Sequence, residues 1–418
     1  MIKQNEGTIN HLIVLDIEGV LLPKRRYLLF EVTRKLSLLE FAHIIFIGGL
    51  YEIGFLSLES ALKRIFRVLR KLTIDDLFEF YKEIPLMPGV EEVFTELNKL
   101  GYRTALISSG LPTFLVEDLA TRLKADYAFG LKLEVVNGHL TGEISGDVLR
   151  PKGKAVVLKR IMEKDSLSPK DCVVVADDRN NLPMFPLCRL SIGYNPDFIL
   201  SRKSNFVVNG DLTGILPVIK DGLRQAPSLP SRRDILRETI HVGSFLVLFV
   251  CQYFLNRLWV SLLILTVTLL YAVSEFARLR GINVPIFSTI TWKATVKPEL
   301  YEFATAPIFF AIGITLSLIF FPAPISYASV AILTLGDGFA TVFGKILGRN
   351  VLPFNKGKTV EGSIFGFLFA FLGAMFFVNP IAALIGALTG MVIECLPLPI
   401  SDNVTIPMVS GLVLMAVS

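Results

Sequence analysis

Three short apolar runs in the first half of the chain each end in a group of polar residues. They span 11–16, 102–107 and 172–176, and they end at Asp16, at Ser108-Ser109-Gly110 and at Asp177-Asp178. Runs of this length, bounded by turn residues, are typical of buried parallel strands. Segments with helical periodicity, such as 89–100 and 154–164, lie between them. The alternation predicts an α/β domain with an open, mostly parallel sheet and helices on both faces.

Long apolar stretches dominate the second half of the chain. They lie at about 239–256, 258–277, 304–322, 325–346, 363–378, 380–397 and 403–418. A helix needs about 20 apolar residues to cross a bilayer, and several of these stretches approach that length. The pattern predicts an all-α polytopic membrane domain of about seven transmembrane helices.

Charge is distributed as unevenly as hydrophobicity. Residues 1–237 carry 33 Lys+Arg and 29 Asp+Glu, whereas residues 238–418 carry 9 and 8. The second part is too apolar for a soluble domain of its size. The segment Pro227-Ser-Leu-Pro-Ser231 has the composition of a linker. We therefore expect a soluble domain over 1–222, a linker over 223–236 and a membrane domain over 237–418.

Net charge and cysteine content exclude several classes of protein. A net charge of +5 is too small to indicate a nucleic-acid partner. The long apolar stretches exclude a secreted disulfide scaffold, and the four cysteines, which form no CxxC pair and lie far apart, are expected to be small buried apolar residues. No signal peptide is visible, and Arg257 is the one basic residue expected in the loops opposite the soluble domain. The positive-inside rule therefore predicts a multi-pass protein with its N-terminal domain and active sites in the cytoplasm.

The polar groups that follow the predicted strands should converge, because ligands bind at the carboxyl ends of parallel strands. Asp16 suits the role of a carboxylate nucleophile at phosphorus. Glu18 could protonate the leaving oxygen and then activate water. Ser108 and the backbone N–H groups after it could hold phosphate oxygens, with Lys152 neutralising their charge. Asp177, together with Asp16, could hold Mg²⁺.

Four motifs in this half resemble those of the haloacid dehalogenase-like phosphatases, and most of all the phosphoserine phosphatase-like branch. They are Asp16-Ile-Glu-Gly-Val, Ser108-Ser-Gly, Pro151-Lys-Gly-Lys and Ala176-Asp-Asp-Arg-Asn-Asn, within a similarity that covers about residues 10–220. The resemblance implies a Rossmann-like parallel sheet with a helical cap at about 22–86. It also implies an aspartyl-phosphate at Asp16, Mg²⁺ dependence and hydrolysis of a phosphomonoester. The phosphate or substrate would contact Ser108, Ser109, Gly110 and Asn180.

Two positions depart from this family's pattern. Glu18 stands where most members carry Asp, and Asn181 stands where many carry a second Asp in the fourth motif. These departures leave open the alternative that the domain is a regulatory module without turnover. The cap segment 36–58 is unusually apolar. It is expected to be either a buried cap helix or a lipid-facing or prenyl-binding surface.

Ionisable residues within or beside apolar spans are functional candidates, because burying them in hydrocarbon is costly. Six of them fall at the cytoplasmic ends of the predicted spans, namely His241, Glu275, Asp337, Glu361, Glu394 and Asp402. Because all six lie on the same predicted side of the membrane, we expect them to share a site. Carboxylates suit Mg²⁺, and Lys345, Lys356 and Lys358 suit a triphosphate. The segment Lys356-Gly-Lys-Thr lacks the first glycine of a P-loop and a preceding strand, so we reject a P-loop.

The same residues resemble the integral-membrane CTP-using enzymes, which include dolichol and phytol kinases and, more distantly, phosphatidate cytidylyltransferases. The match covers about 231–418 and includes Arg237-Glu-x-x-His241, Gly336-Asp-Gly, Lys358-Thr-Val-Glu361-Gly and Glu394…Ser401-Asp-Asn403. The resemblance implies transfer of the γ-phosphoryl of CTP to a long-chain lipid alcohol such as a polyprenol.

The roles in this second site are likewise implied by the resemblance. Asp337 and Asp402 would hold Mg²⁺, and His241, Glu394 or Asp337 would receive the hydroxyl proton. The nucleotide and its phosphates would contact Lys345, Lys356, Lys358, Thr359, Glu361 and Asn403. The alternative is a CTP:lipid-phosphate cytidylyltransferase. The sequence leaves open the lipid, the phosphatase substrate and the oligomeric state.

Overall fold

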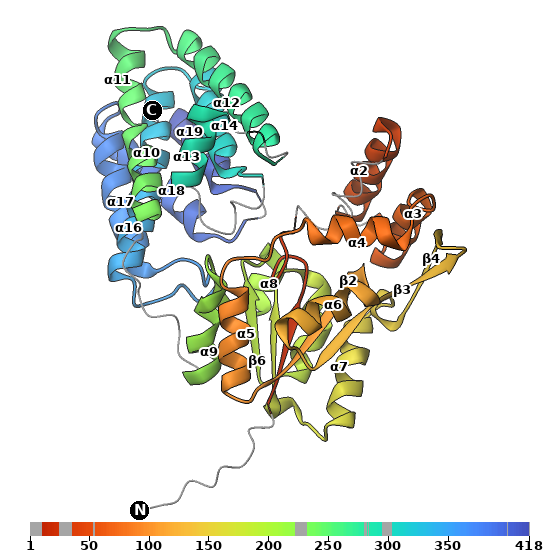
Figure 1. Cartoon of the computed structure of the whole chain (residues 1–418). Helices are drawn as coiled ribbons and strands as arrows, with labels where there is room; N and C mark the ends of the chain where they lie inside the picture. The colour runs from red at the N-terminus through yellow and green to blue at the C-terminus, as the bar shows by residue number, and fades with distance from the viewer. Residues whose placement is uncertain are drawn as a thin grey trace, which may run out of the picture. The chain divides into compact units, whose positions relative to one another are not determined.

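The computed structural model describes residues 11–24, 36–52, 55–221, 232–279, 282, 284–294, 303–398 and 400–417. The chain forms two compact units, residues 1–224 and 225–418 (Figure 1). The linker sequence at 227–231 and cap residues 25–35 lie outside the described residues.

A seven-stranded sheet forms the centre of the N-terminal unit, in the order β4-β3-β2-β1-β5-β6-β7. Its strands are β1 (Leu12–Asp16), β2 (Arg103–Pro112), β3 (Tyr127–Val136), β4 (His139–Ser145), β5 (Cys172–Ala176), β6 (Leu190–Tyr194) and β7 (Phe206–Val208). All neighbouring strands are parallel except β3 and β4. This architecture confirms the predicted Rossmann-like parallel sheet.

Strand β1 lies in the middle of the sheet, where Leu12 is in register with Arg103 of β2 and with Cys172 of β5. Every residue of β1 and β5 is buried, as the continuous apolar sequences LIVLD and CVVVA require for strands covered on both faces. The carboxyl ends of the three strands therefore meet at one edge. Asp16 pairs with Ile107, one residue before Ser108.

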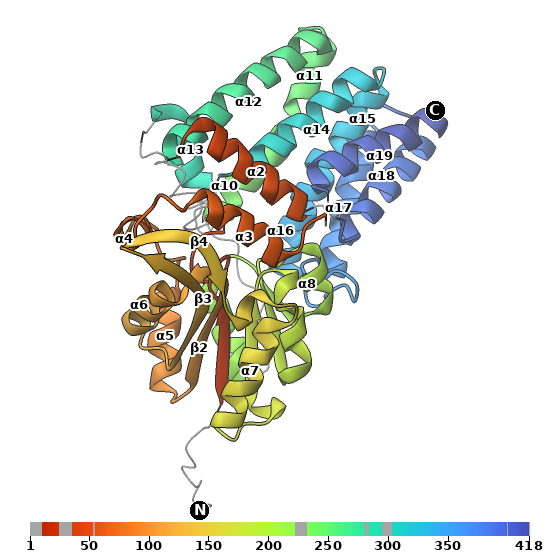
Figure 2. The same ribbon diagram turned by 90° about the vertical axis from the view of Figure 1, so that its right-hand side faces the viewer.

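Helices flank this sheet and form the cap. The helices beside the sheet are α5 (Val90–Lys99), α6 (Thr113–Leu123), α7 (Gly153–Lys164), α8 (Phe198–Lys203) and α9 (Ile215–Asp221), with 3₁₀ turns at η2 (Asp147–Leu149), η3 (Pro169–Asp171), η4 (Arg179–Leu187) and η5 (Leu212–Gly214). The cap consists of α2 (Leu38–Glu52), α3 (Leu58–Val68) and α4 (Ile74–Lys82). Figure 2 shows the β3–β4 hairpin beside α3, and Leu140 N donates to Leu72 O at 2.9 Å.

Helices make up most of the C-terminal unit in the part that the structure describes. Its helices are α10 (Arg232–Gly243), α11 (Leu246–Tyr253), α12 (Arg257–Leu279), α13 (Pro285–Ala294), α14 (Ala306–Phe320), α15 (Ile325–Ala331), the π-helical turn η7 (Ile332–Asp337), α16 (Gly338–Leu347), α17 (Val360–Ala374), α18 (Pro380–Cys395) and α19 (Asp402–Val417). Small residues let these helices approach closely. A Cβ on Gly366 of α17 would lie 2.8 Å from Ala340 Cβ of α16.

Two helical segments among the described residues are long and apolar enough to cross a membrane, Arg257–Arg278 and Ile325–Leu347. They support association of the chain with a membrane. The remaining predicted spans coincide with helices that are shorter, such as Val360–Ala374 and Pro380–Cys395. The seven predicted crossings and their orientation are therefore not confirmed.

Candidate functional site

Asp16 is buried at the carboxyl end of β1, and both of its oxygens accept hydrogen bonds. Oδ1 accepts from Lys154 Nζ at 2.7 Å and from the backbone N–H of Ile17 at 2.8 Å. Oδ2 accepts from Nδ2 of Asn181. Burial alone would lower the pKa of Lys154, but the charges of Asp16 and of neighbouring acids outweigh it and raise that pKa. Lys154 is therefore a fixed positive charge beside Asp16.

Three carboxylates gather at the ends of β1 and β5. One oxygen each from Asp16, Asp177 and Asp178 lies within 4.8 Å of the others. Burial and the adjacent charge of Asp178 raise the pKa of Asp177 well above its usual range. Asp177 Oδ1 is buried and has no hydrogen-bond partner among the described residues. Hard carboxylate oxygens suit Mg²⁺, so this arrangement fits a divalent cation.

Lys24, which the sequence did not single out, reaches the same acidic group. Its Nζ lies 2.6 Å from Asp177 Oδ2 and 3.7 Å from Asp178 Oδ2. Burial opposes its charge, but the two aspartates raise the pKa of Lys24 above its ordinary value. Lys24 therefore neutralises part of the charge that would otherwise attract a cation.

Glu18 lies two residues beyond Asp16 and faces the end of β2. Ser108 Oγ is 2.9 Å from each oxygen of Glu18. Burial, followed by the charge of Asp16, raises the pKa of Glu18 to about 7. A Cβ on Gly110 would lie 2.5 Å from Glu18 Oε1, so a side chain at this position would displace the Glu18 carboxylate from where it lies. The carboxyl group is therefore well placed to exchange protons near neutral pH.

The two serines after β2 face in different directions. Ser108 Oγ accepts from the backbone N–H groups of Gly110 at 3.1 Å and Leu111 at 2.8 Å. Ser109 Oγ instead donates to the carbonyl oxygen of Val148 at 3.1 Å. Ser108 therefore belongs to the site, whereas Ser109 stabilises the loop around it.

The lysine of the third motif requires a correction. The sequence pointed to Lys152, but Lys152 is exposed, has a positive φ of 61° and precedes the first residue of α7. Lys154 lies inside the helix and contacts Asp16 and Asn181. The two side chains differ in direction because Lys152 has a left-handed backbone before the helix begins, whereas Lys154 lies in the first turn of α7. The motif Pro151-Lys-Gly-Lys154 contains both lysines, so the sequence alone does not show which of them contacts Asp16.

The fourth motif links the acidic group to the cap. Asn180 Nδ2 donates to Asp178 at 3.0 Å, and its Oδ1 accepts from the hydroxyl of Tyr51 at 2.8 Å. Asn181 Nδ2 donates to Asp16 and to Asp178 Oδ1. The sequence motif predicts Asn180 at the site. It marks Asn181 only as a departure from the family's pattern, and no local signal points to Tyr51.

A second polar group lies in the C-terminal unit, around Lys358. Its Nζ is 2.5 Å from Glu394 Oε1, 3.5 Å from Asp337 Oδ1 and 3.5 Å from Asp402 Oδ2. These contacts bring together the start of α19, the end of α18 and the turn η7. The sequence expected all four side chains to share a site.

His241 of α10 joins this group through two side chains. Its Nε2 lies 3.7 Å from Asp337 Oδ2 and 3.3 Å from Asn403 Oδ1. Its Nδ1 lies 3.4 Å from the carbonyl oxygen of Thr334, which belongs to the π-helical turn. The ring is therefore held between η7 and α19. We name His241, Asp337, Lys358, Glu394, Asp402 and Asn403 the Lys358 cluster.

Other residues expected beside these are engaged elsewhere. Glu275 pairs with Arg278 of the same helix at 2.8 Å, and Glu361 accepts from Asn350 Nδ2 at 2.8 Å. Lys345 Nζ lies 2.6 Å from Asp234 Oδ1. Thr359 accepts from the N–H of Gly362 and caps α17. Lys356 is half-buried in the loop before α17.

Comparison with known proteins places the N-terminal unit among hydrolases. The family model for haloacid dehalogenase-like hydrolases matches residues 13–186. Phosphoserine phosphatase from Archaeoglobus fulgidus is 33% identical over 170 residues, which cover 40% of this chain and 48% of that protein. The chain therefore spans about half the length of this relative. Phosphoserine phosphatase from Methanocaldococcus jannaschii is 33% identical over 168 residues, covering 40% of this chain and 79% of that protein.

A solved structure is also similar to part of this chain. The phospho-aspartyl intermediate analogue of phosphoserine phosphatase is 29% identical, with a TM-score of 0.46, and the alignment covers 50% of this chain and 99% of that one. The matched family model includes Asp16 and ends at residue 186, before the helices of the C-terminal unit.

Proposed function

The chain belongs to the haloacid dehalogenase-like hydrolases through residues 13–186, and from this premise we propose that its N-terminal unit hydrolyses phosphomonoesters through an aspartyl-phosphate at Asp16. The observation that carries the proposal is the group of Asp16, Asp177 and Asp178 within 4.8 Å, with Lys154 on Asp16 and Glu18 beside it. This set combines a nucleophile, a proton donor and ligands for a cation at the same strand ends.

In the first step an oxygen of Asp16 attacks phosphorus, and the bond from phosphorus to the leaving oxygen breaks. Glu18 in its protonated form gives its proton to that oxygen. In the second step Glu18, now ionised, takes a proton from water, and the water oxygen attacks phosphorus to release inorganic phosphate. Lys154 and Asn181 hold Asp16 throughout, and Ser108 at the end of β2 would contact the phosphoryl oxygens.

Asp16, Asp177 and Asp178 would hold Mg²⁺, which supplies positive charge for the phosphoryl oxygens when bound. The relatives with matching sequence are named phosphoserine phosphatases, so phosphoserine is the first substrate to test. The Tyr51–Asn180 hydrogen bond brings the cap to the fourth motif, where a side chain of the cap would meet the substrate.

The test uses the full chain in detergent with Mg²⁺ and a panel of phosphoserine, an aryl phosphate and a polyprenyl phosphate. We expect release of inorganic phosphate, and its loss in Asp16→Asn. Asp75→Asn, an exposed aspartate in the first turn of α4, is the matched control and should retain activity. If the unmutated chain with Mg²⁺ releases no phosphate from any of them, the unit is a regulatory module and the proposal is wrong.

A second proposed function concerns the C-terminal unit, namely CTP-dependent phosphorylation of a long-chain lipid alcohol such as a polyprenol. It is supported by the Lys358 cluster, in which one ammonium faces three carboxylates beside His241. Asp337 and Asp402 would hold Mg²⁺. His241, Glu394 or Asp337 would receive the hydroxyl proton. With both functions the chain would be a bifunctional membrane enzyme.

The residues that the resemblance assigns to the nucleotide fall into two groups in the structure. Lys358 and Asn403 belong to the Lys358 cluster. Lys345 is paired with Asp234, and Thr359 and Glu361 make contacts at the start of α17. We propose Lys358 as the main phosphate contact, with Lys356 on the same loop. Lys345, Thr359 and Glu361 would position this loop and α17.

Labelled CTP distinguishes this kinase from a cytidylyltransferase that joins CMP to a lipid phosphate. The full chain is incubated with a polyprenol or a lipid phosphate and with CTP labelled at the α or the γ phosphate. We expect γ label in the lipid product from polyprenol. Label from the α position would overturn the kinase proposal and favour the cytidylyltransferase. The same preparation, inserted in vesicles, would show by protease access whether both sites face one compartment.

A further inference from the structure

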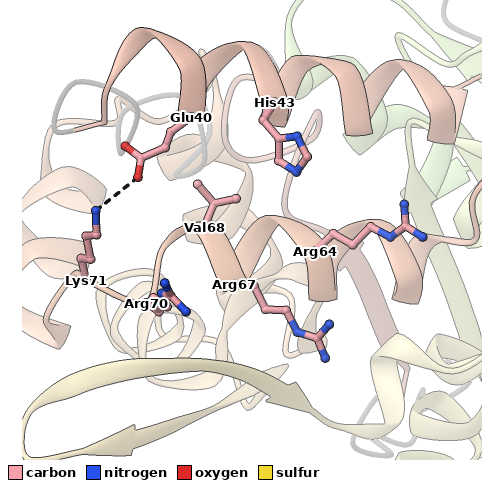
Figure 3. Close-up of a pocket in the computed structure, with 7 residues that line it drawn as sticks. All are labelled: Glu40, His43, Arg64, Arg67, Val68, Arg70 and Lys71. Carbon is pink, nitrogen blue, oxygen red and sulfur yellow. Dashed lines mark ion pairs between the residues drawn. The ribbon is translucent and has the colours of Figure 1, made fainter.

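A basic cavity of about 330 Å³ lies on the cap, between α2 and the end of α3. Its lining residues are Glu40, His43, Arg64, Arg67, Val68, Arg70 and Lys71 (Figure 3). Figure 3 shows Glu40 and His43 on α2 facing α3, which carries Arg64 and Arg67, while Arg70 lies in the turn after α3. None of the carboxylates near Asp16 lines this cavity, so its chemistry is independent of the proposed phosphatase site.

The positive charge of this cavity is only partly compensated. Lys71 Nζ lies 3.5 Å from Glu40 Oε1, and Arg67 Nη2 lies 3.1 Å from Glu143 of β4. Arg64 and Arg70 are exposed and form no ion pair with the described residues. Planar guanidinium groups of this kind suit the oxygens of a phosphate.

An apolar surface of α2 lies next to the cavity. Leu39 is 83% exposed and Phe46 is 63% exposed, and seven residues of spacing place them on one face of the helix. Phe55, which follows the helix, is 79% exposed. Ile44 and Ile47 are buried in the core, so α2 has a packed side and a separate exposed apolar side.

We propose that α2 and α3 form a bilayer-docking surface that binds anionic phospholipid headgroups. The phosphate of the headgroup would lie between Arg64 and Arg70, while Leu39, Phe46 and Phe55 enter the boundary with the acyl chains. A free phosphate would account for the arginines but not for the apolar side chains beside them. The candidate membrane spans of the C-terminal unit would hold the same chain at a bilayer.

The test measures amide hydrogen exchange in the full chain reconstituted into nanodiscs. One preparation contains phosphatidylcholine alone, and the other contains about one-third phosphatidylglycerol. We expect exchange in 38–52 and 58–71 to be up to about 25-fold slower on the anionic nanodiscs, because each of the two arginines near such a surface strengthens binding by about fivefold. Arg64→Gln/Arg70→Gln should remove the difference between the two preparations.

Arg122→Gln/Arg160→Gln is the matched control, since these exposed arginines lie outside the cavity. This control variant should retain the full difference in exchange between the two nanodiscs.

Equal exchange on both nanodiscs in the unmutated chain would overturn the proposal. Protection by millimolar glycerol 3-phosphate on phosphatidylcholine nanodiscs, without protection by the anionic bilayer, would also overturn it and assign the cavity to a soluble phosphate. Leu39→Ser/Phe46→Ser should weaken the protection by lipid, and unchanged protection would exclude insertion of α2.

Discussion

The ammonium of Lys154 lies 2.7 Å from Asp16 Oδ1, and the two side chains are 5% and 4% exposed. The ion pair joins the N-terminal residues of α7 to the end of β1. The carboxylate that would attack phosphorus is thus held by Lys154 and not by Lys152, the lysine to which the sequence pointed. This relationship orients the carboxylate and leaves both groups buried with a partner.

Replacing Lys154 with Met should therefore affect activity and stability together. We expect phosphatase activity to fall by about 10²–10³-fold, because a positioned cation is lost. Leaving Asp16 buried without its partner should also cost ~3–5 kcal/mol of folding free energy. Kinetics on phosphoserine and thermal unfolding measure the two effects. Lys152→Met is the control, and a larger loss there than in Lys154→Met would reverse the assignment.

Glu18 should act as both acid and base, so Glu18→Gln should lower turnover by about 10²–10⁴-fold. With an aryl phosphate, whose leaving group needs little protonation, the first step should survive and the aspartyl-phosphate should accumulate as a burst. The pKa of about 7 also sets a pH dependence. The acid form is needed for leaving-group protonation, so activity on alkyl phosphates should fall as the pH rises above about 7. A Glu18→Gln enzyme with no burst and the same pH profile would contradict this role.

Lys24 lies against two of the three carboxylates that would bind Mg²⁺. Removing its charge in Lys24→Met should tighten Mg²⁺ binding by about fivefold, equal to ~1 kcal/mol, since Lys24 is partly exposed. Isothermal titration of the full chain with MgCl₂ measures the change. Lys99→Met, an exposed lysine on α5, should leave Mg²⁺ binding as it is. Weaker binding in Lys24→Met would mean that Lys24 supports the site instead of competing with the cation.

Lys358 faces three carboxylates, whereas Lys345 pairs with Asp234 on α10. Lys358→Met should abolish transfer of label from γ-labelled CTP to a polyprenol, with a loss of at least about 100-fold. Lys345→Met should retain most of the transfer. Size-exclusion chromatography in detergent shows whether each variant keeps its fold. Equal losses in two well-folded variants would argue against Lys358 as the main phosphate contact.

The sheet and much of the first site could be predicted from the sequence for a local reason. Buried strands such as β1 and β5 have uninterrupted apolar sequences. The acidic residue that ends or follows each apolar run lies at the carboxyl edge of the sheet. This pattern places Asp16 and Asp177 at that edge. Membrane crossings were harder to predict, because helices such as Val360–Ala374 are apolar and yet shorter than a typical span.

Which buried side chains contact one another depends on how segments far apart in the sequence pack. A local sequence pattern carries no information about this packing. Tyr51 and Asn180 are 129 residues apart and share a hydrogen bond at 2.8 Å. Glu275 and Glu361 match the pattern of the Lys358 cluster in sequence, but they make contacts in other places. The sequence could identify the residue types, but only the arrangement of helices determined which of them meet.

By itself, the sequence determined the alternation of strands and helices, the boundary between a charged and an apolar half, and the acids at the strand ends. Hydrophobic periodicity and charge are local properties, so these followed without coordinates. Only the tertiary structure decided that Lys154 and not Lys152 reaches Asp16, because α7 begins between the two lysines and directs Lys154 to the end of β1, while Lys152 stays exposed before the helix. It likewise decided that Lys358 joins Asp337, Glu394 and Asp402, since helices far apart in the chain must pack before these charges can meet.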